Sequence, residues 1–219
     1  MVLFLVILEP TVPEVDLGFI ISAGSTDASS TLQQIKDIIK SFINKYSIYR
    51  LRYGIISGGS LPRIELALPD SVKSGVLQKV EGLPRPKGTP DLAKALLLGV
   101  ELLSPARPSA QKVLVIITDV KSGSSPRELR LAAQAVDNEG IRVFAVTVGK
   151  KVDRSELITG TGSGKNIINS SKTDEGGEVR EKIMKKIREG KCGSLFNTSV
   201  VGATLDLEDA PSRLRSLIK

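Results

Sequence analysis

The chain has 219 residues, a formal net charge of +7, one cysteine, and neither histidine nor tryptophan. Hydrophobic residues make up 41% of it and charged residues 25%, which is the composition of a globular domain and excludes a chain that is mainly disordered, collagenous or coiled coil. Without histidine, a Ser–His–Asp triad and the usual zinc sites cannot be built, and the solitary Cys192 cannot form a disulfide within the chain. We find no nucleophile–base pair, so we do not expect an enzyme.

The first half of the chain alternates between strand and helix patterns. Residues 16–21 are a short apolar run typical of a buried strand, and residues 53–56 are a second one. Between them, apolar side chains recur at helical spacing over residues 30–44. Residues 63–68 alternate with a period of two, as a half-exposed strand does, and a short helix is expected over 71–80.

The second half continues this alternation. We expect a helix with Thr89 as its N-cap and Pro90 in its first turn. The apolar runs 113–117 and 143–148 predict strands buried on both faces, and the capping box at 125–128 starts a helix between them. Three further elements are expected: a helical turn at 154–158, a strand at 166–168 and a helix at 177–189.

This order predicts an α/β fold with a doubly wound, mostly parallel central sheet, helices on both faces, and residues 63–68 as an antiparallel edge strand. The domain is expected to span residues 16–190. Residues 1–15 form an apolar segment and linker, and residues 191–219 a tail or the start of a neighbouring segment. Residues 1–8 are too short to span a bilayer; a signal remnant, a buried strand and the arbitrary start of a fragment all remain open.

In such a sheet, ligands bind beyond the carboxyl ends of the strands. Three loops meet this condition: residues 22–27, residues 87–89, and the pair Thr118 and Asp119. They offer hydroxyl and carboxylate oxygens, which are the ligands that Mg²⁺, Ca²⁺ and Mn²⁺ prefer.

The chain resembles a von Willebrand factor type A (VWFA) domain from about residue 16 to residue 190. The resemblance rests on the order of elements, the strand VLVIITD, the Gly-Thr loop before Pro90 and the segment EGIRVFAVTVG. It implies a Rossmann-like fold and a metal-ion-dependent adhesion site. That site has the pattern Asp-x-Ser-x-Ser in the first loop, a Thr in the second and an Asp in the third. Its metal completes its coordination with a carboxylate of the partner protein.

The adhesion-site pattern is only partly present. Ser22 stands where the pattern has its Asp, and Gly24 where it has its first Ser. Thr26 keeps a hydroxyl at the second Ser, while Thr89 and Asp119 match. Because one of two carboxylates is missing, we expect a vestigial site that binds Mg²⁺, Ca²⁺ or Mn²⁺ weakly or not at all. In that case Asp119 would simply accept hydrogen bonds from amides of the first loop.

The resemblance implies a non-enzymatic protein-interaction and adhesion module of extracellular-matrix type. It would be secreted, belong to a longer multidomain chain, and bind a matrix or cell-surface protein. The alternative is an intracellular VWFA protein that acts as a scaffold in a metal- or nucleotide-dependent assembly. The side chains expected to contact the partner are Ser22, Ser25, Thr26, Asp27, Thr89 and Asp119.

Two N-glycosylation sequons, at Asn169 and Asn197, are weak signs of secretion. Residues 159–166 read TGTGSGKN, which departs from a phosphate-binding loop at both ends. We therefore predict a flexible surface loop there.

The charge is not concentrated enough to indicate a nucleic-acid partner. Lys185 and Lys186 lie close to Glu181 and Glu189 in the sequence, and aromatic residues make up only 4% of the chain. This pattern is typical of a solvated helix face, whereas a nucleic-acid surface would cluster basic and stacking aromatic residues. No stretch of the sequence has the length of a transmembrane helix.

Overall fold

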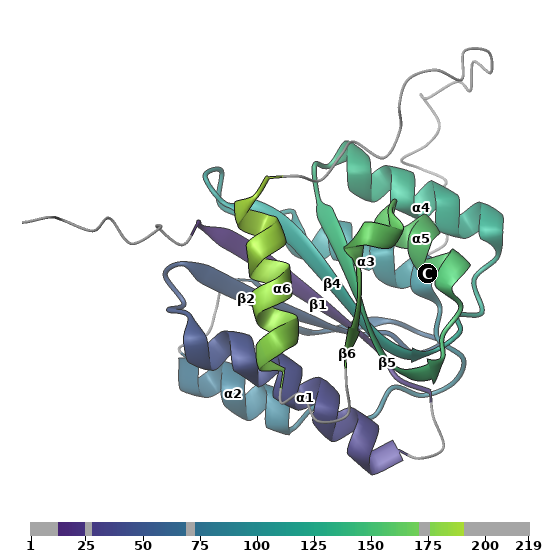
Figure 1. The fold of residues 1–219 in the computed structure, drawn as a ribbon, viewed down its shortest axis with the longest axis horizontal. Helices are drawn as coiled ribbons and strands as arrows, with labels where there is room; N and C mark the ends of the chain where they lie inside the picture. Colours follow the sequence, from purple (N-terminus) through teal and green to yellow (C-terminus); the bar gives the residue numbers. More distant parts are fainter. Residues whose placement is uncertain (1–12, 25–27, 69–72, 171–175, 191–219) are drawn as a thin grey trace, which may run out of the picture.

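A computed structural model describes residues 13–24, 28–68, 73–170 and 176–190 (Figure 1). Our expectations for residues 1–12 and 191–219, Cys192 and Asn197 among them, lie outside the described residues, and the domain limits stay a prediction. The elements are, in chain order, β1 (Val15–Ser22), α1 (Ala28–Lys45), β2 (Leu51–Ser57), β3 (Arg63–Leu66), α2 (Lys73–Glu81), α3 (Leu92–Leu103), β4 (Gln111–Val120), α4 (Pro126–Asn138), β5 (Arg142–Lys151), α5 (Arg154–Thr161), the 3₁₀ helix η1 (Gly164–Asn166), β6 (Ile167–Ser170) and α6 (Gly177–Arg188).

The sheet has the strand order β3-β2-β1-β4-β5-β6. Every neighbouring pair is parallel except β2 and β3, which are antiparallel. The predicted fold class and the antiparallel edge strand are therefore confirmed. In the register of β1 on β4, Ser22 lies opposite Thr118, so the loops that follow these two strands start side by side.

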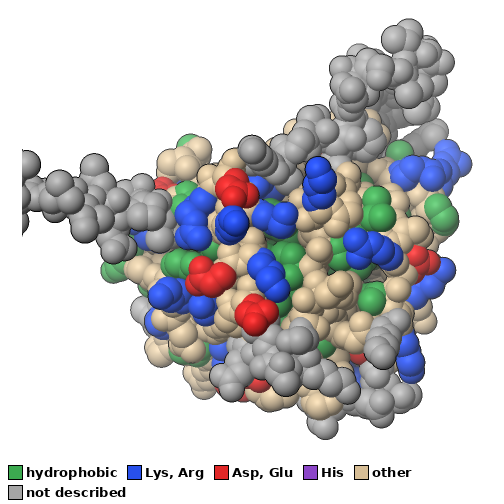
Figure 2. All heavy atoms as spheres, in the orientation of Figure 1, with side chains coloured by type: hydrophobic (Ala, Val, Ile, Leu, Met, Phe, Trp, Pro, Cys, Tyr) green, Lys and Arg blue, Asp and Glu red, His purple; other side chains and the backbone are tan. Residues whose placement is uncertain are grey.

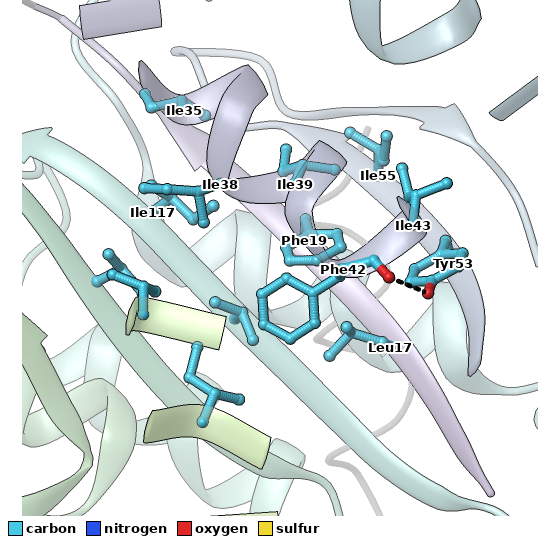
Figure 3. Close-up of a cluster of buried hydrophobic side chains, with 14 of the residues drawn as sticks. Leu17, Phe19, Ile35, Ile38, Ile39, Phe42, Ile43, Tyr53, Ile55 and Ile117 are labelled. Carbon is cyan, nitrogen blue, oxygen red and sulfur yellow. Dashed lines mark hydrogen bonds between the residues drawn. The ribbon is translucent and has the colours of Figure 1, made fainter. Parts of the chain in front are cut away.

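Helices α1, α2 and α6 cover one face of the sheet (Figure 1). The core beneath them includes Phe19 of β1 and Phe42 of α1, whose rings meet edge to face with centroids 5.5 Å apart (Figure 3). The Tyr53 hydroxyl donates a hydrogen bond to the carbonyl oxygen of Phe42 at 3.1 Å (Figure 3). Burial raises the pKa of Tyr53, so this phenol stays a neutral donor and fixes α1 to β2.

Helices α3, α4 and α5 cover the other face (Figure 1). Their buried side chains include Leu96, Leu129 and Leu157, which pack against the opposite side of β1, β4 and β5. The capping box predicted for α4 is confirmed: Ser125 Oγ accepts from Glu128 N, and the Glu128 carboxylate accepts from Ser125 N.

The prediction of a flexible surface loop at residues 159–166 is wrong. These residues complete α5 and form η1, and the side chains of Thr161 and Asn166 are buried. Asn166 Nδ2 donates to the carbonyl oxygen of Thr161 at 3.1 Å. The glycines suggested a loop, but Gly162 instead has a φ of 70° and ends α5.

The exposed face of α6 carries Lys and Arg side chains interspersed with Glu (Figure 2). Lys182 pairs with Glu178, Lys185 lies 4.0 Å from Glu189, and Arg180 pairs with Glu181. This is the solvated, charge-paired face that the sequence predicts. Among the helices described, none is long and apolar enough to cross a membrane.

Candidate functional site

Asp119 lies near the end of β4 and is almost fully buried, with 4% of its surface exposed. Its Oδ1 accepts a hydrogen bond from the backbone N–H of Gly24 at 3.0 Å. Within the described residues, Oδ2 is buried without a hydrogen-bond partner. The expected contact with a first-loop amide is therefore present, and one carboxylate oxygen remains available.

Ser22 and Gly24 hold the two positions where the adhesion-site pattern has Asp and Ser. Ser22 is buried at the end of β1, directly beside Thr118 of β4. A Cβ at Gly24 would lie 3.0 Å from Cγ1 of Val120, so the glycine lets the first loop pack closely against the end of β4. The expectations for Ser25, Thr26 and Asp27 concern residues outside the described part of the chain.

The prediction that Thr89 caps helix α3 is wrong. The N-cap is Asp91, whose Oδ1 accepts from the backbone N–H of Lys94 at 3.1 Å. The amides of Leu92 and Ala93 donate to the hydroxyls of Ser122 and Ser124, which come from the loop after β4. The first turn is thus satisfied without Thr89, which is exposed.

The sequence reasoning missed Ser122 and Ser124, which lie in the loop after β4 and contact the start of α3. Besides capping α3, Ser124 Oγ donates to Asp91 Oδ1 at 3.0 Å, and Ser122 Oγ donates to Ser124 Oγ at 2.9 Å. This network engages the carboxylate of Asp91, which also forms an ion pair with Lys94. The signal for it was the KSGSS segment that directly follows a buried strand.

Two carboxylates from the start of α5 border this network. The Glu156 carboxylate accepts from the backbone N–H of Ser122 at 2.9 Å, while Asp153 forms an ion pair with Lys121 at 3.0 Å. Burial raises the pKa of Glu156, and the nearby charge of Asp153 raises it further. Hydrogen bonds from Ser155 and Lys121 hold the pKa of Asp153 below its usual range.

We expect Glu156→Gln to stabilise the domain at pH 7 relative to the unmodified chain. Because the folded-state pKa of Glu156 lies above its usual value of 4.5, folding disfavours its ionised form, and the ionised group therefore opposes stability at neutral pH. That cost disappears as the pH falls below 4.5. Urea unfolding of both proteins at pH 7 and pH 4 measures the effect. The advantage of the variant must shrink at the lower pH, and an equal or larger advantage there would contradict the assignment.

The side-chain oxygens at this end of the sheet are of the type that a hard cation binds, but together they carry little negative charge. Asp119 Oδ2 is an orphaned, buried carboxylate oxygen, which is the sort of atom that a metal ion takes up. The hydroxyls of Ser22 and Thr89 lie at the same end of the sheet. The carboxylate of Asp91 is already engaged, because it caps α3, accepts a hydrogen bond from Ser124 and pairs with Lys94. Within the described residues, no group of three or more His, Cys, Asp or Glu side chains is placed to hold a metal ion.

The chain belongs to the von Willebrand factor type A domain family, whose family model matches residues 16–182. It is 32% identical over 149 residues to the collagen alpha-1(XX) chain of Mus musculus, and the aligned region covers 65% of this chain and 11% of the collagen chain. It is 23% identical over 184 residues to the Homo sapiens collagen alpha-6(VI) chain, and the aligned region covers 80% of this chain and 8% of the collagen chain. The chain thus spans about a tenth of the length of these curated relatives.

Solved structures share the same fold. Proximal thread matrix protein 1 of the mussel byssus superposes with a TM-score of 0.69 at 18% identity, covering 80% of this chain and 46% of that one. A second structure of that protein has zinc in its metal-ion-dependent adhesion site (MIDAS) motif. It has a TM-score of 0.65 at 19% identity, covering 81% of this chain and 46% of that one. The manganese-loaded TRAP protein of Plasmodium vivax gives 0.63 at 16% identity, covering 80% of this chain and 73% of that one.

Proposed function

We propose that this domain is a non-enzymatic protein-interaction module of extracellular-matrix type. It binds a protein partner at the C-terminal edge of its sheet, and its dependence on metal is lost or weak. The similarity to two collagen chains supports the matrix setting. Of the contact residues expected from the sequence, we propose Ser25, Thr26, Asp27 and Thr89 as direct contacts. Ser22 and Asp119 are each only 4% exposed, so they would act through a bound cation and not by direct contact.

The observation that carries the proposal is the state of Asp119. Its buried carboxylate is the single acidic group among the positions of the adhesion-site pattern, and one of its oxygens is already bound to the Gly24 amide. A bound cation would use Asp119 Oδ2 with the hydroxyls of Thr26 and Thr89, and would attract a carboxylate of the partner. One protein carboxylate does little to offset the cost of dehydrating a small divalent ion. The partner is then held mainly by direct contacts with the loops.

Secretion also gives the sequon at Asn169 a role. Asn169 is exposed on the edge strand β6, and its amide oxygen accepts a hydrogen bond from Thr147 Oγ1 at 2.8 Å. We propose Asn169 as an N-glycosylation position of the secreted chain, together with Asn197.

Substitution of Thr89 by lysine tests the binding edge. Thr89 is exposed and does not cap α3, so Thr89→Lys changes the surface without removing a helix cap. We expect it to weaken binding to immobilised matrix proteins by about tenfold or more while leaving the melting temperature unchanged. Surface plasmon resonance against a panel of fibrillar collagens and matrix glycoproteins gives the readout.

The matched control is Ser104→Lys, which places the same charge at the exposed C-terminal end of α3. Binding should be equal in EDTA and in millimolar Mg²⁺. If Ser104→Lys weakens binding as much as Thr89→Lys does, the contact lies elsewhere on the domain. Binding abolished by EDTA would show that the metal is still needed.

A further inference from the structure

A groove lies beside β3, the edge strand farthest from β6, at the turn that joins β2 to β3. One wall is formed by β3 together with Ser60 and Leu61, and the other by residues 84–87. Its volume is about 390 Å³. We call it the β3 groove. It is distinct from the partner-binding edge proposed above, and the inference does not rest on that proposal.

The β3 groove is lined by three exposed cationic side chains, those of Arg63, Arg85 and Lys87, and by one carboxylate, that of Glu65. Within the described part of the chain, none of the three cations forms an ion pair or a side-chain hydrogen bond. Elsewhere on the surface, cations are commonly paired, as Lys40 is with Asp37 and Glu81. The groove therefore presents an uncompensated positive charge to solvent.

The groove is also pre-formed. The Ser60 amide donates to the carbonyl oxygen of Lys87 at 2.9 Å, and a Cβ at Gly59 would lie only 2.4 Å from that oxygen. The two walls are thus in close backbone contact at one end, and Pro84 and Pro86 restrict the second wall. A rigid groove loses little conformational entropy when a ligand binds.

Two features of the β3 groove indicate what kind of chain fits it. Strand β3 pairs with β2 on one side alone, so its other edge offers backbone donors and acceptors to an added strand. Leu61, which also lines the groove, is 70% exposed, which is unusual for a large apolar side chain in the described residues. Backbone hydrogen bonding and apolar contact are both provided by an extended polypeptide.

We propose that the β3 groove binds an acidic, extended segment of a protein partner, which adds as a strand alongside β3. Acidic side chains of the segment meet Arg63, Arg85 and Lys87, and an apolar one covers Leu61. A sulfated polysaccharide fits less well, because it offers no backbone hydrogen bonds to the strand edge and because Glu65 repels its evenly spaced anionic groups.

The test uses a fluorescent synthetic peptide of about eight alternating Glu and Val residues, the length of an ordinary strand. Binding is measured by fluorescence anisotropy at about 0.15 M salt, where exposed charges act only over about 8 Å. We expect the double variant Arg85→Glu with Lys87→Glu to bind the peptide at least about tenfold more weakly than the unmodified chain. Both side chains are exposed and unpaired, so melting measured by circular dichroism should be unchanged.

The matched control is Arg127→Glu with Arg130→Glu, which makes the same change in net charge on the exposed face of α4. This control should retain peptide binding. Thr89→Lys should also retain it, because that substitution is expected to affect only the partner-binding edge proposed above. A peptide of alternating Glu and Pro, which lacks ladder donors at proline, should bind at least about tenfold more weakly.

Three results would overturn the proposal. The first is an equal loss of peptide binding in both charge-reversed proteins, which would mean non-specific attraction. The second is equal affinity for the proline peptide, which would exclude strand addition. The third is retention of the domain on heparin through Arg85 and Lys87 without any peptide binding, which would make a sulfated polysaccharide the ligand.

Discussion

Replacing Arg107 by alanine is expected to destabilise the domain by about 3–5 kcal/mol, because it leaves the fully buried carboxylate of Asp16 without its counter-charge. Asp16 lies in β1 with none of its side chain exposed, and Arg107 lies in the connection between α3 and β4. Arg107 Nη2 and Nε donate to Asp16 Oδ1 at 2.7 and 2.9 Å, and the Arg107 backbone N–H donates to Oδ2 at 2.7 Å. All of these bonds except the last are lost with the side chain.

The same guanidinium also joins segments that are distant in the sequence. Its Nη1 donates to the carbonyl oxygen of Tyr49 at 2.7 Å, and its Nη2 donates to those of Val15 and Arg50 at 3.2 and 3.1 Å. These contacts fix the start of β1 and the turn into β2 at the end of the sheet opposite the candidate site. The substitution should therefore lower stability without altering partner binding by the molecules that remain folded.

Urea unfolding followed by far-ultraviolet circular dichroism gives the free energy of unfolding. Arg107→Lys should show an intermediate loss, since lysine keeps the charge but cannot form the planar fork. Arg85→Ala is the matched control: it removes an exposed, unpaired arginine and should change stability by no more than about 0.5 kcal/mol. A loss below about 1 kcal/mol for Arg107→Ala would show that Asp16 is not stabilised by this pair.

The strands and most helices are predictable because local patterns and tertiary burial agree. The apolar run 113–117 lies in β4, which is buried on both faces, and the capping box at Ser125 starts α4 where the sequence places it. The Arg107–Asp16 pair is not predictable, because its two members are 91 positions apart and no periodicity relates them. An aspartate within an apolar strand was the signal that a distant cation had to be present.

The errors have the same origin. Thr89 and Asp91 are both good N-caps by residue type, and the choice between them depends on Ser122 and Ser124, which approach α3 from a loop about thirty residues later. The glycines of residues 159–166 suggest a loop, but Thr161 and Asn166 are buried, and their side chains donate hydrogen bonds to the carbonyl oxygens of Leu157 and Thr161. Short-range composition does not report such contacts.

For the candidate site, the sequence led us to expect that the first loop meets Asp119, but it did not show how that carboxylate is engaged. The match of Asp119 and Thr89 to the pattern predicts a site at the carboxyl ends of the strands. The hydrogen bond from Gly24 to Asp119, and the orphaned Oδ2 beside it, appear only in three dimensions. The same is true of Asp91, a carboxylate near the site that is held by Lys94 and Ser124.

If charge is what limits metal binding, then Ser22→Asp with Gly24→Ser should create an ion-binding site. Ser22 lies beside the end of β4, so an aspartate there brings a second carboxylate to the edge that carries Asp119 Oδ2. The new serine must displace Val120 slightly, since its Cβ lies 3.0 Å from Val120 Cγ1. Without metal, two buried carboxylates repel each other, so the variant should melt below the unmodified chain in EDTA.

Mg²⁺ should reverse that loss. At a concentration about 100 times the dissociation constant, the ion adds about 2.7 kcal/mol of stability, which raises the melting temperature of a domain of this size by about 5–10 °C. The unmodified chain should shift by less than about 1 °C, as should the control Ser22→Asn with Gly24→Ser, which has similar shape but no added charge. Thermal melting with EDTA or Mg²⁺, together with isothermal titration, separates these outcomes. A large shift in the unmodified chain would mean that Asp119 alone suffices, whereas no shift in the charged variant would mean that geometry, not charge, limits the site.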